Sequence, residues 1–202
     1  MPGSTVRPLP YTDAGAKLVF YIVLIVFLLL EWSIRLRSRS HRQGARIEDT
    51  SIVAVFGLVI AGFVVAFLCA SKARSAAIPD GRWPIFIVGI AFMAAGTALR
   101  QWAVLTLGRF FTVDVRVQSD QTVVEGGPYR WVRHPSYSGM VVVFVGVGFA
   151  LGNWGSLVAL VVLPTIGLLI RIRVEERMLL AQLGDPYRRF AESRARLFPG
   201  IW

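Results

Sequence analysis

Apolar residues run along this chain in five long stretches that are separated by polar segments. The stretches are Lys17–Ser33, Ile52–Ala70, Pro84–Trp102, Tyr137–Leu151 and Trp154–Ile172. A helix needs about 20 mostly apolar residues to cross the hydrocarbon core of a bilayer. The pattern therefore predicts an all-α integral membrane protein with about five transmembrane helices.

Only Gly152 and Asn153 separate the last two stretches. Such a short connection predicts a tight helical hairpin. Its first arm, Tyr137–Leu151, has 15 residues, or about 22 Å of helix, and is short for a full crossing. Pro135 suits the first turn of this arm, whereas Pro164 is expected to bend the second.

Two segments outside the apolar stretches are also patterned. Residues 107–133 alternate apolar and polar positions and contain a Gly-Pro pair, which predicts extended backbone and turns. A structured loop of this length is usually functional, so we expect a lid or half of a pocket there. Further on, Gly184-Asp185-Pro186 predicts a helix end and a restart. A basic helix is then expected around Tyr187–Arg196, along the cytoplasmic surface.

Composition supports the membrane class. Hydrophobic residues make up 55% of the 202 residues, and the mean hydropathy is +0.60, well above the norm of soluble domains. We expect one membrane domain, residues 1–202, in which 1–106 supply three N-terminal spans and 107–202 a catalytic region.

The net charge of +10 comes from bases that are concentrated on one side of the predicted spans. Of the 22 Lys and Arg residues, 17 lie in the segments Arg35–Arg46, Arg100–Arg133 and Arg171–Arg196. The positive-inside rule assigns these segments to the cytoplasm, with the N-terminus outside and the C-terminus inside. The dispersed charge suits contact with anionic membrane lipids. Nucleic acid is not an expected partner, because no recognised basic-aromatic module accompanies the charge.

The chain contains few of the residues that form metal sites and disulfides. Cys69 is the only cysteine, and His41 and His134 are the only histidines. A disulfide within one chain is excluded, and no His or Cys metal constellation has enough ligands, so we expect no metal.

Two polar clusters at the mouths of the later spans are candidates for a functional site. One is Arg133-His134-Pro135, and the other contains Arg171 and Glu175, one helical turn apart. Ionisable groups near membrane depth are functional suspects. An arginine four residues before a glutamate is the weaker orientation of a helical ion pair, so pairing alone is a poor explanation of Arg171. His134 adds a group that donates or accepts hydrogen bonds near neutral pH.

These clusters belong to a larger combination of positions in the C-terminal half of the chain. It comprises Gly127–Tyr129, Arg133–Gly139, Arg171, Glu175–Glu176, Gly184, Tyr187 and Phe198–Trp202. The combination resembles the isoprenylcysteine carboxyl methyltransferase family over residues 107–202. The resemblance implies an integral membrane methyltransferase that uses S-adenosylmethionine, bound in a cytosolic pocket outside the Rossmann scheme.

The resemblance also implies roles for individual residues. Cofactor contacts are expected from Gln121, Thr122, Val123, Val124, Tyr129, His134, Pro135, Ser136, Tyr137 and Glu175. Arg171 corresponds to a substrate-binding arginine, and we assign the chemistry to Arg171, Arg133 and His134. Asp114 falls where the family has another polar contact.

The expected methyl acceptor is the carboxylate of a lipophilic, isoprenylcysteine-like molecule that enters sideways between helices from the bilayer. A carboxyl group is already ionised at neutral pH, so proximity and alignment replace a general base. The strong preference for arginine over lysine, 20 to 2, fits a prokaryotic protein and therefore the inner membrane.

Three alternatives stay open from the sequence. A phospholipid amine or a small thiol is an alternative acceptor, and His134 or Glu176 would then remove its proton. A sterol-type reductase that uses NADPH is a second alternative, because such enzymes look similar in their C-terminal part. A membrane scaffold without activity is the third.

Overall fold

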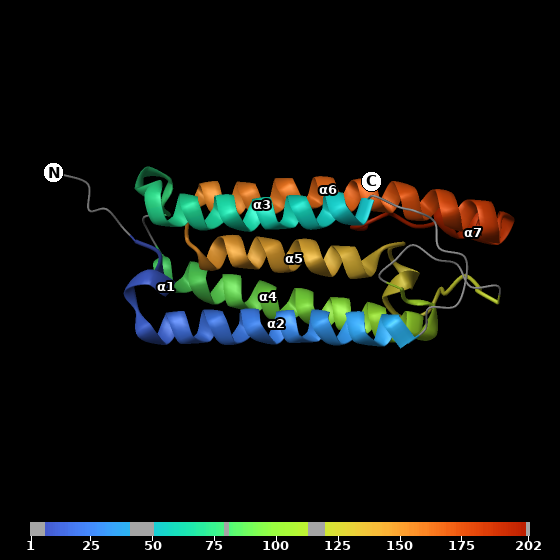
Figure 1. The fold of residues 1–202 in the computed structure, drawn as a ribbon, viewed down its shortest axis with the longest axis horizontal. Helices are drawn as coiled ribbons and strands as arrows, with labels where there is room; N and C mark the ends of the chain where they lie inside the picture. Colours follow the sequence, from blue (N-terminus) through green and yellow to red (C-terminus); the bar gives the residue numbers. More distant parts are fainter. Residues whose placement is uncertain (1–6, 41–50, 79–80, 113–119, 201–202) are drawn as a thin grey trace.

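The computed structural model describes residues 7–40, 51–78, 81–112 and 120–200. Within them the chain is almost entirely helical (Figure 1). The α-helices are α1 (Leu9–Thr12), α2 (Ala14–Ser40), α3 (Ser51–Lys72), α4 (Arg82–Leu107), α5 (Pro135–Ala150), α6 (Trp154–Leu183) and α7 (Asp185–Glu192). Three 3₁₀ turns join them: η1 (Arg74–Ala76), η2 (Gly108–Phe110) and η3 (Gly127–Arg130).

The five predicted spans correspond to α2 through α6. Four of these helices, α2, α3, α4 and α6, are long and apolar enough to cross a membrane, whereas α5 is shorter. The protein is an integral membrane protein. Helix α6 extends beyond its apolar stretch, from Ile172 to Leu183. Arg, Glu, Met and Leu are good helix formers, and no helix-breaking residue occurs in this segment before Gly184.

Helix α5 lies in the middle of the bundle, between α4 and α6 (Figure 1). On the outer sides, α3 packs along α6 and α2 packs against α4. Most residues of α5 are buried, on all faces of the helix, which is typical of an interior helix. The short apolar stretch predicted from Tyr137 to Leu151 is therefore largely covered by protein.

Glycines allow α4 and α5 to approach closely. Gly89 and Gly96 of α4 face Gly146 and Gly139 of α5. A Cβ atom at Gly96 would lie 2.6 Å from the carbonyl oxygen of Gly139, and one at Gly146 would lie 2.6 Å from the carbonyl oxygen of Gly89. Small residues at such contacts let helix backbones pack tightly in a membrane.

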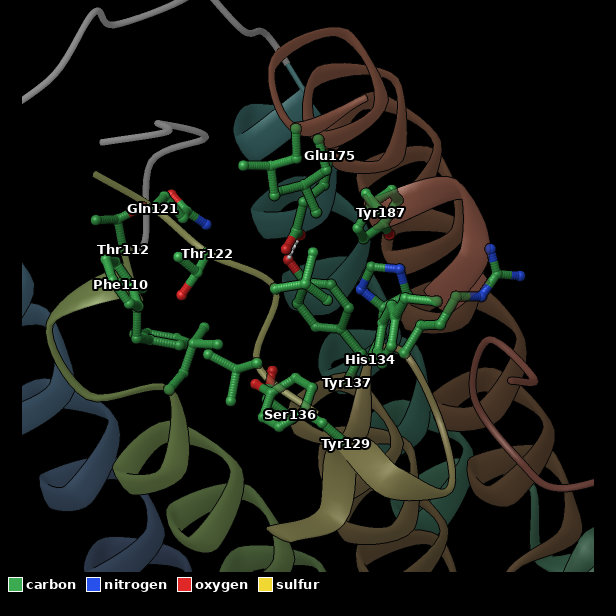
Figure 2. Close-up of a pocket in the computed structure, with 18 of the residues that line it drawn as sticks. Phe110, Thr112, Gln121, Thr122, Tyr129, His134, Ser136, Tyr137, Glu175 and Tyr187 are labelled. Atoms are coloured by element: carbon green, nitrogen blue, oxygen red, sulfur yellow. Dashed lines mark hydrogen bonds between the residues drawn. The ribbon is translucent and has the colours of Figure 1, made fainter. Parts of the chain in front are cut away.

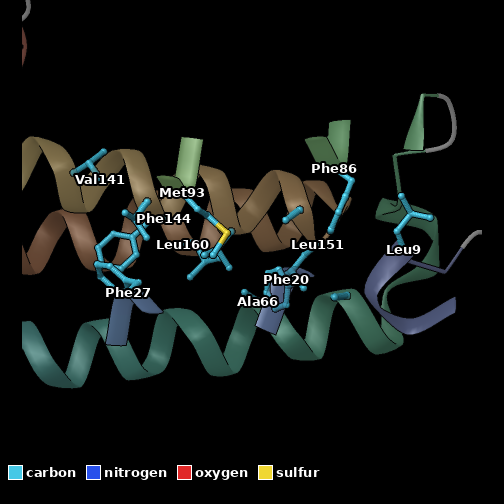
Figure 3. Packing of buried hydrophobic residues seen from close by; sticks show 14 of the residues in the cluster. Leu9, Phe20, Phe27, Ala66, Phe86, Met93, Val141, Phe144, Leu151 and Leu160 are labelled. Atoms are coloured by element: carbon cyan, nitrogen blue, oxygen red, sulfur yellow. The ribbon is translucent and has the colours of Figure 1, made fainter. Parts of the chain in front are cut away.

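Each of the helices α2 to α6 contributes side chains to one apolar interior. Figure 3 shows members from α2, α3, α4, α5 and α6: Phe27, Ala66, Met93, Phe144 and Leu160. These residues are buried. The described residues therefore share one packed core, and the bundle forms a common frame for whatever lies at its ends.

The connection from α5 to α6 is the predicted short turn. Gly152 adopts a φ of 57°, and the Asn153 side chain accepts a hydrogen bond from the Ser156 amide at 3.1 Å, which caps α6. The two arms run back along each other, but α5 packs more extensively along α4 than along α6. Helix α6 is continuous through Pro164, whose ring lies against Gly62 of α3.

Helix α7 restarts after Gly184, where φ is 58°. It begins and ends earlier than the predicted Tyr187–Arg196 helix, because residues after Glu192 pair with another segment. The backbone amides of Arg133 and His134 donate to the carbonyls of Ala195 and Arg196 at 2.9 and 3.0 Å. The C-terminal segment thus runs beside the start of α5.

Candidate active site

A pocket lies at the end of the bundle where α4 and α6 end and α5 begins (Figure 2). It holds about 830 Å³ of empty space, its open mouth included. Its lining residues come from the α4–η2 end, the segment after residue 120, η3, the start of α5, the second half of α6 and α7. They are Leu107, Phe110, Phe111, Thr112, Gln121, Thr122, Val123, Val124, Tyr129, Arg133, His134, Ser136, Tyr137, Arg171, Glu175, Leu179, Leu183, Tyr187 and Phe190.

The turn before α5 is held in place by its backbone. Gly127 has a φ of 54°, and a Cβ atom there would lie 2.7 Å from Thr106 Oγ1, so only glycine fits this approach to α4. Pro128 and Tyr129 are buried in η3. The Ser138 hydroxyl donates to the Leu197 carbonyl, which adds a link to the C-terminal segment. The turn is fixed both to α4 and to the end of the chain.

Glu176 joins three basic side chains on the outer side of this turn. Its carboxylate lies 2.7 Å from Arg133 Nη1, 3.2 Å from His134 Nε2 and 3.0 Å from Arg196 Nε. Glu176 is buried and does not line the pocket. An ionised carboxylate only accepts hydrogen bonds, so it fixes Nε2 of His134 as the protonated ring nitrogen. The ion cluster therefore ties α6 to the turn and to the C-terminal segment.

Glu175, the neighbouring carboxylate, faces the pocket instead. The Tyr137 hydroxyl donates to Glu175 Oε2 at 2.7 Å, as Figure 2 shows. The rings of Tyr137 and His134 are stacked, with centroids 5.7 Å apart. The carboxylate and the two rings form one polar wall of the pocket.

Arg171 lies one helical turn before Glu175 and is buried. Its Nη1 donates to the Ser51 hydroxyl of α3 at 3.2 Å, so part of its hydrogen-bonding capacity links α6 to α3. The guanidinium carries several donors in a fixed plane, which is the arrangement that binds carboxylates in two places.

Two buried phenols stand outside the spans and stay neutral. Burial, and then the Glu175 charge, raises the pKa of Tyr129. Burial, and then Glu176 and Glu175, raises the pKa of Tyr187. Both hydroxyls therefore keep their protons over the whole working pH range.

The structure brings the predicted site residues together, with two qualifications. All of them line the pocket except Pro135, which is fully buried in the first turn of α5. Pro135 shapes the backbone there rather than presenting an atom to the pocket. Asp114 lies outside the described residues. The functional roles of the lining residues remain predictions. In the part of the chain that the structure describes, no three acidic, His or Cys side chains cluster as metal ligands.

The sequence reasoning did not assign eight of the nineteen lining residues to the site: Leu107, Phe110, Phe111, Thr112, Leu179, Leu183, Tyr187 and Phe190. A periodicity signal was present for some of them. Leu179 and Leu183 follow Glu175 at four-residue steps and so share its face of α6. Tyr187 and Phe190 are three residues apart on the buried face of α7.

A second hollow, the lateral cleft, opens beside the pocket. It holds about 1210 Å³ of empty space, open parts included, and is mostly apolar. Its lining residues come from α2 to α6 and from the segment after η2: Phe27, Leu28, Glu31, Trp32, Arg35, Ile52, Val55, Phe56, Val59, Phe63, Arg100, Phe111, Thr112, Tyr137, Met140, Phe144, Leu168 and Arg171. Leu28, Trp32 and Phe56 are exposed, whereas Phe27, Phe144 and Leu168 are buried. The cleft therefore opens between α2 and α3 toward the lipid and ends in the core.

The pocket and the lateral cleft share four lining residues: Phe111, Thr112, Tyr137 and Arg171. Near this junction, Arg100 of α4 forms a two-pronged ion pair with Glu31 of α2. Arg100 also donates to the carbonyl of Ser136 at 3.4 Å. The pocket and the apolar cleft thus meet at a junction that includes one arginine and one tyrosine.

Known proteins resemble this chain in both sequence and fold. Residues 88–181 match the sequence profile of the isoprenylcysteine carboxyl methyltransferase (ICMT) family. The protein-S-isoprenylcysteine O-methyltransferase of Schizosaccharomyces pombe is 27% identical over 188 residues, which cover 85% of this chain and 78% of the relative. The chain is therefore similar in sequence to the ICMT family over residues 88–181. Protein-S-isoprenylcysteine O-methyltransferase A of Arabidopsis thaliana is 34% identical over 121 residues, 59% of this chain and 61% of the relative.

The fold of this chain matches a solved ICMT structure. The structure of a eukaryotic intramembrane Ras methyltransferase, ICMT, superimposes with a TM-score of 0.69. The match covers 96% of this chain and 70% of that chain, at 22% sequence identity. At this identity the similarity establishes the shared membrane fold, and the match to the family profile and to the relatives indicates methyl transfer as the type of reaction.

Proposed function

We propose that this protein transfers a methyl group from S-adenosylmethionine to the carboxylate of a lipophilic, isoprenylcysteine-like acceptor. One observation carries the proposal: Arg171 and Tyr137 line both the pocket and the lateral cleft. Methyl transfer needs a water-soluble donor and a membrane-borne acceptor to meet. The junction of the pocket and the lateral cleft provides such a place.

The pocket residues fit S-adenosylmethionine. When bound, this cofactor supplies an electrophilic methyl group on a positively charged sulfur. Glu175 and the stacked rings of Tyr137 and His134 offer negative charge and aromatic faces to a cation. Tyr129, Ser136 and the segment of residues 121–124 complete the wall. We assign the cofactor contacts to these residues, with Pro135 as support for the turn.

The lateral cleft fits the apolar tail of the acceptor. Its buried end at Phe27 and Phe144 lies toward the core, and its exposed rim faces the lipid. Arg171 would hold the acceptor's carboxylate at the junction, because a planar guanidinium binds a carboxylate through two parallel hydrogen bonds. A lipidated acceptor would therefore enter from the bilayer with its tail in the cleft.

The chain's own residues mainly position the acceptor and shield the reacting groups from water. A carboxylate acceptor is ionised at neutral pH and needs no proton removed. Arg171 orients it, the turn at Arg133 and His134 shapes the pocket, and the surrounding apolar side chains exclude water. An amine or thiol acceptor would need a base, but Glu176 is engaged by three basic groups and His134 Nε2 is bonded to it. Their engagement supports a carboxylate as the acceptor.

We further propose that the protein forms a single membrane domain and lies in the inner membrane of a prokaryote. Its N-terminus would lie outside, with its C-terminus and pocket in the cytoplasm, as the distribution of Lys and Arg favours. The first three spans would supply walls of the lateral cleft, and residues 107–202 the pocket.

Methyl-labelled S-adenosylmethionine tests the reaction. Purified protein in detergent is incubated with the labelled cofactor and S-farnesylcysteine, or with phosphatidylethanolamine, or with a small thiol. Alkaline treatment releases volatile labelled methanol only from a methyl ester. We expect ester formation on the farnesylcysteine carboxylate. Label that stays on an amine or thiol would overturn the choice of acceptor.

Cofactor class is tested separately by calorimetric titration with S-adenosylmethionine and with NADPH. We expect binding of the first and none of the second. Binding of NADPH alone would favour the reductase alternative, and binding of neither would favour a scaffold.

A further inference from the structure

The Tyr187 hydroxyl is a buried polar group that the fold leaves unused. The side chain is 4% exposed and lines the pocket. Its hydroxyl oxygen has no hydrogen-bond partner among the described residues. Buried polar atoms without a partner are rare in native proteins, because losing water without replacement is unfavourable. A group in this state on a pocket wall is placed to bond a ligand.

The hydroxyl is also a dependable donor. Burial and the charges of Glu176 and Glu175 keep it protonated. A neutral phenol both donates and accepts, so it can bond either an acceptor nitrogen or a hydroxyl of a ligand.

The surroundings of Tyr187 indicate which part of the cofactor would lie there. Tyr187 packs with Tyr129 and Phe190 in an aromatic and aliphatic cluster that also contains Leu179 and Leu183. None of these five residues lines the lateral cleft. The cluster thus forms the part of the pocket wall that the acceptor does not reach, and its flat apolar surfaces suit a planar ring.

We propose that the Tyr187 hydroxyl hydrogen-bonds the nucleoside part of the bound cofactor, which rests on the proposed function. The reactive sulfur must lie at the junction, because the acceptor carboxylate meets it there at Arg171. The nucleoside then extends away from the junction, toward the aromatic cluster. Tyr187 is the member of this cluster whose hydroxyl is recorded without a partner. It is a binding contact contributed by α7.

The Tyr187→Phe variant removes the hydroxyl and leaves the ring. Calorimetry on the purified full chain measures Kd for S-adenosylhomocysteine and for methylthioadenosine, which lacks the amino-acid part. We expect Tyr187→Phe to weaken binding of both ligands about threefold to tenfold, the usual effect of one neutral hydrogen bond. The free variant should unfold at the same temperature as wild type or higher, because its unused hydroxyl is gone.

Tyr11→Phe is the matched control. Tyr11 belongs to α1, at the opposite end of the bundle, and is 45% exposed. The Tyr11→Phe variant should bind S-adenosylhomocysteine and methylthioadenosine with the same Kd as the wild type.

Four results would count against the inference. Unchanged binding of both ligands overturns it, and so does weaker binding of S-adenosylhomocysteine alone, which would put the contact on the amino-acid part. A lower unfolding temperature of the free Tyr187→Phe protein would give the hydroxyl a role in the fold instead. If wild type binds neither ligand, the proposed function itself fails.

Discussion

At the scale of the residue, Arg171 is the side chain to which we assign the choice of acceptor. Arg171→Ala should lower kcat/KM for the acceptor about 100-fold, because truncating one partner of a buried charge pair costs about 2–5 kcal/mol. The kcat/KM of Arg171→Lys should lie between those of the wild type and Arg171→Ala, since lysine keeps the charge but loses the planar arrangement of donors. The Kd of the cofactor should change little. Initial rates at varied acceptor concentration, with calorimetry for the cofactor, measure both quantities.

Arg173→Ala is the control for this arginine. Arg173 is exposed and lies two residues further along α6, so its loss changes the charge of the helix without touching the junction. Equal losses of activity in Arg171→Ala and Arg173→Ala would show that general charge, rather than the junction, governs the reaction.

The adjacent carboxylates of α6, Glu175 and Glu176, should have different roles: the first should affect cofactor binding and the second the stability of the fold. Glu175→Gln removes the negative charge that faces the pocket, so it should raise the Kd of S-adenosylmethionine about tenfold with little change in unfolding temperature. Glu176→Gln leaves three basic groups around a neutral amide. It should lower the unfolding temperature by several degrees, as expected for about 1–3 kcal/mol. Calorimetry and thermal unfolding on the same preparations test both. The reverse pattern would contradict the division of roles.

Sequence alone could not assign these roles. The Arg133–Gly139 motif is contiguous, so its members were predictable as one site, and the four-residue step put Arg171 and Glu175 on one face. Adjacent helix residues, however, point about 100° apart, and the rotation of α6 against α5 decides which carboxylate faces the pocket. Tyr187 reaches the pocket only because the chain reverses at Gly184 and α7 packs back.

At the scale of the element, the contact of α4 with α5 depends on glycine. Gly96→Ala would place a methyl group 2.6 Å from the Gly139 carbonyl oxygen, so the two helices must separate. We expect a loss of about 1–3 kcal/mol of stability, measured by thermal unfolding in detergent. Because the start of α5 forms part of the pocket, cofactor binding should weaken as well.

Gly57→Ala provides the comparison. Gly57 lies in α3, and a Cβ atom there would have no neighbour within 4 Å. Alanine favours a helix by up to about 1 kcal/mol over glycine, so this variant should be as stable as wild type or more stable. Similar destabilisation of both variants would refute the close packing of α4 on α5.

Hydropathy predicted the five helices but not their arrangement. An apolar side chain has the same hydropathy whether it meets lipid or protein, so the burial of α5 on all faces could not be predicted from its composition. Its shortness was a signal, since a helix enclosed by neighbours need not match the bilayer thickness.

At the scale of the whole molecule, the site exists only where distant segments meet. The lateral cleft takes its walls from five helices, and its far end at Phe27 and Phe144 joins α2 to α5. No local pattern marks such a cleft, because its residues are ordinary apolar positions of separate spans. Its opening between α2 and α3 follows from packing: among the long helices, α2 packs against α4, and α3 packs along α6.

If the lateral cleft holds the acceptor's tail, a bulky side chain in the cleft should weaken binding of the acceptor and leave binding of the cofactor unchanged. Val59 of α3 lines the cleft, and Val59→Trp would occupy part of its volume. We expect KM for a farnesylated acceptor to rise about tenfold or more, since lost apolar contact of a few CH₂ groups at about 0.8 kcal/mol each is enough. The Kd of S-adenosylmethionine should stay the same, because Val59 does not line the pocket.

Val64→Trp adds the same ring to the same helix at a position that is 53% exposed and does not line the lateral cleft. It should methylate the acceptor as wild type does. An acceptor with a short, polar tail should be used equally poorly by all three proteins, because it gains nothing from an apolar cleft. Should Val59→Trp keep the wild-type KM for the farnesylated acceptor while folding normally, the tail must reach Arg171 by another route.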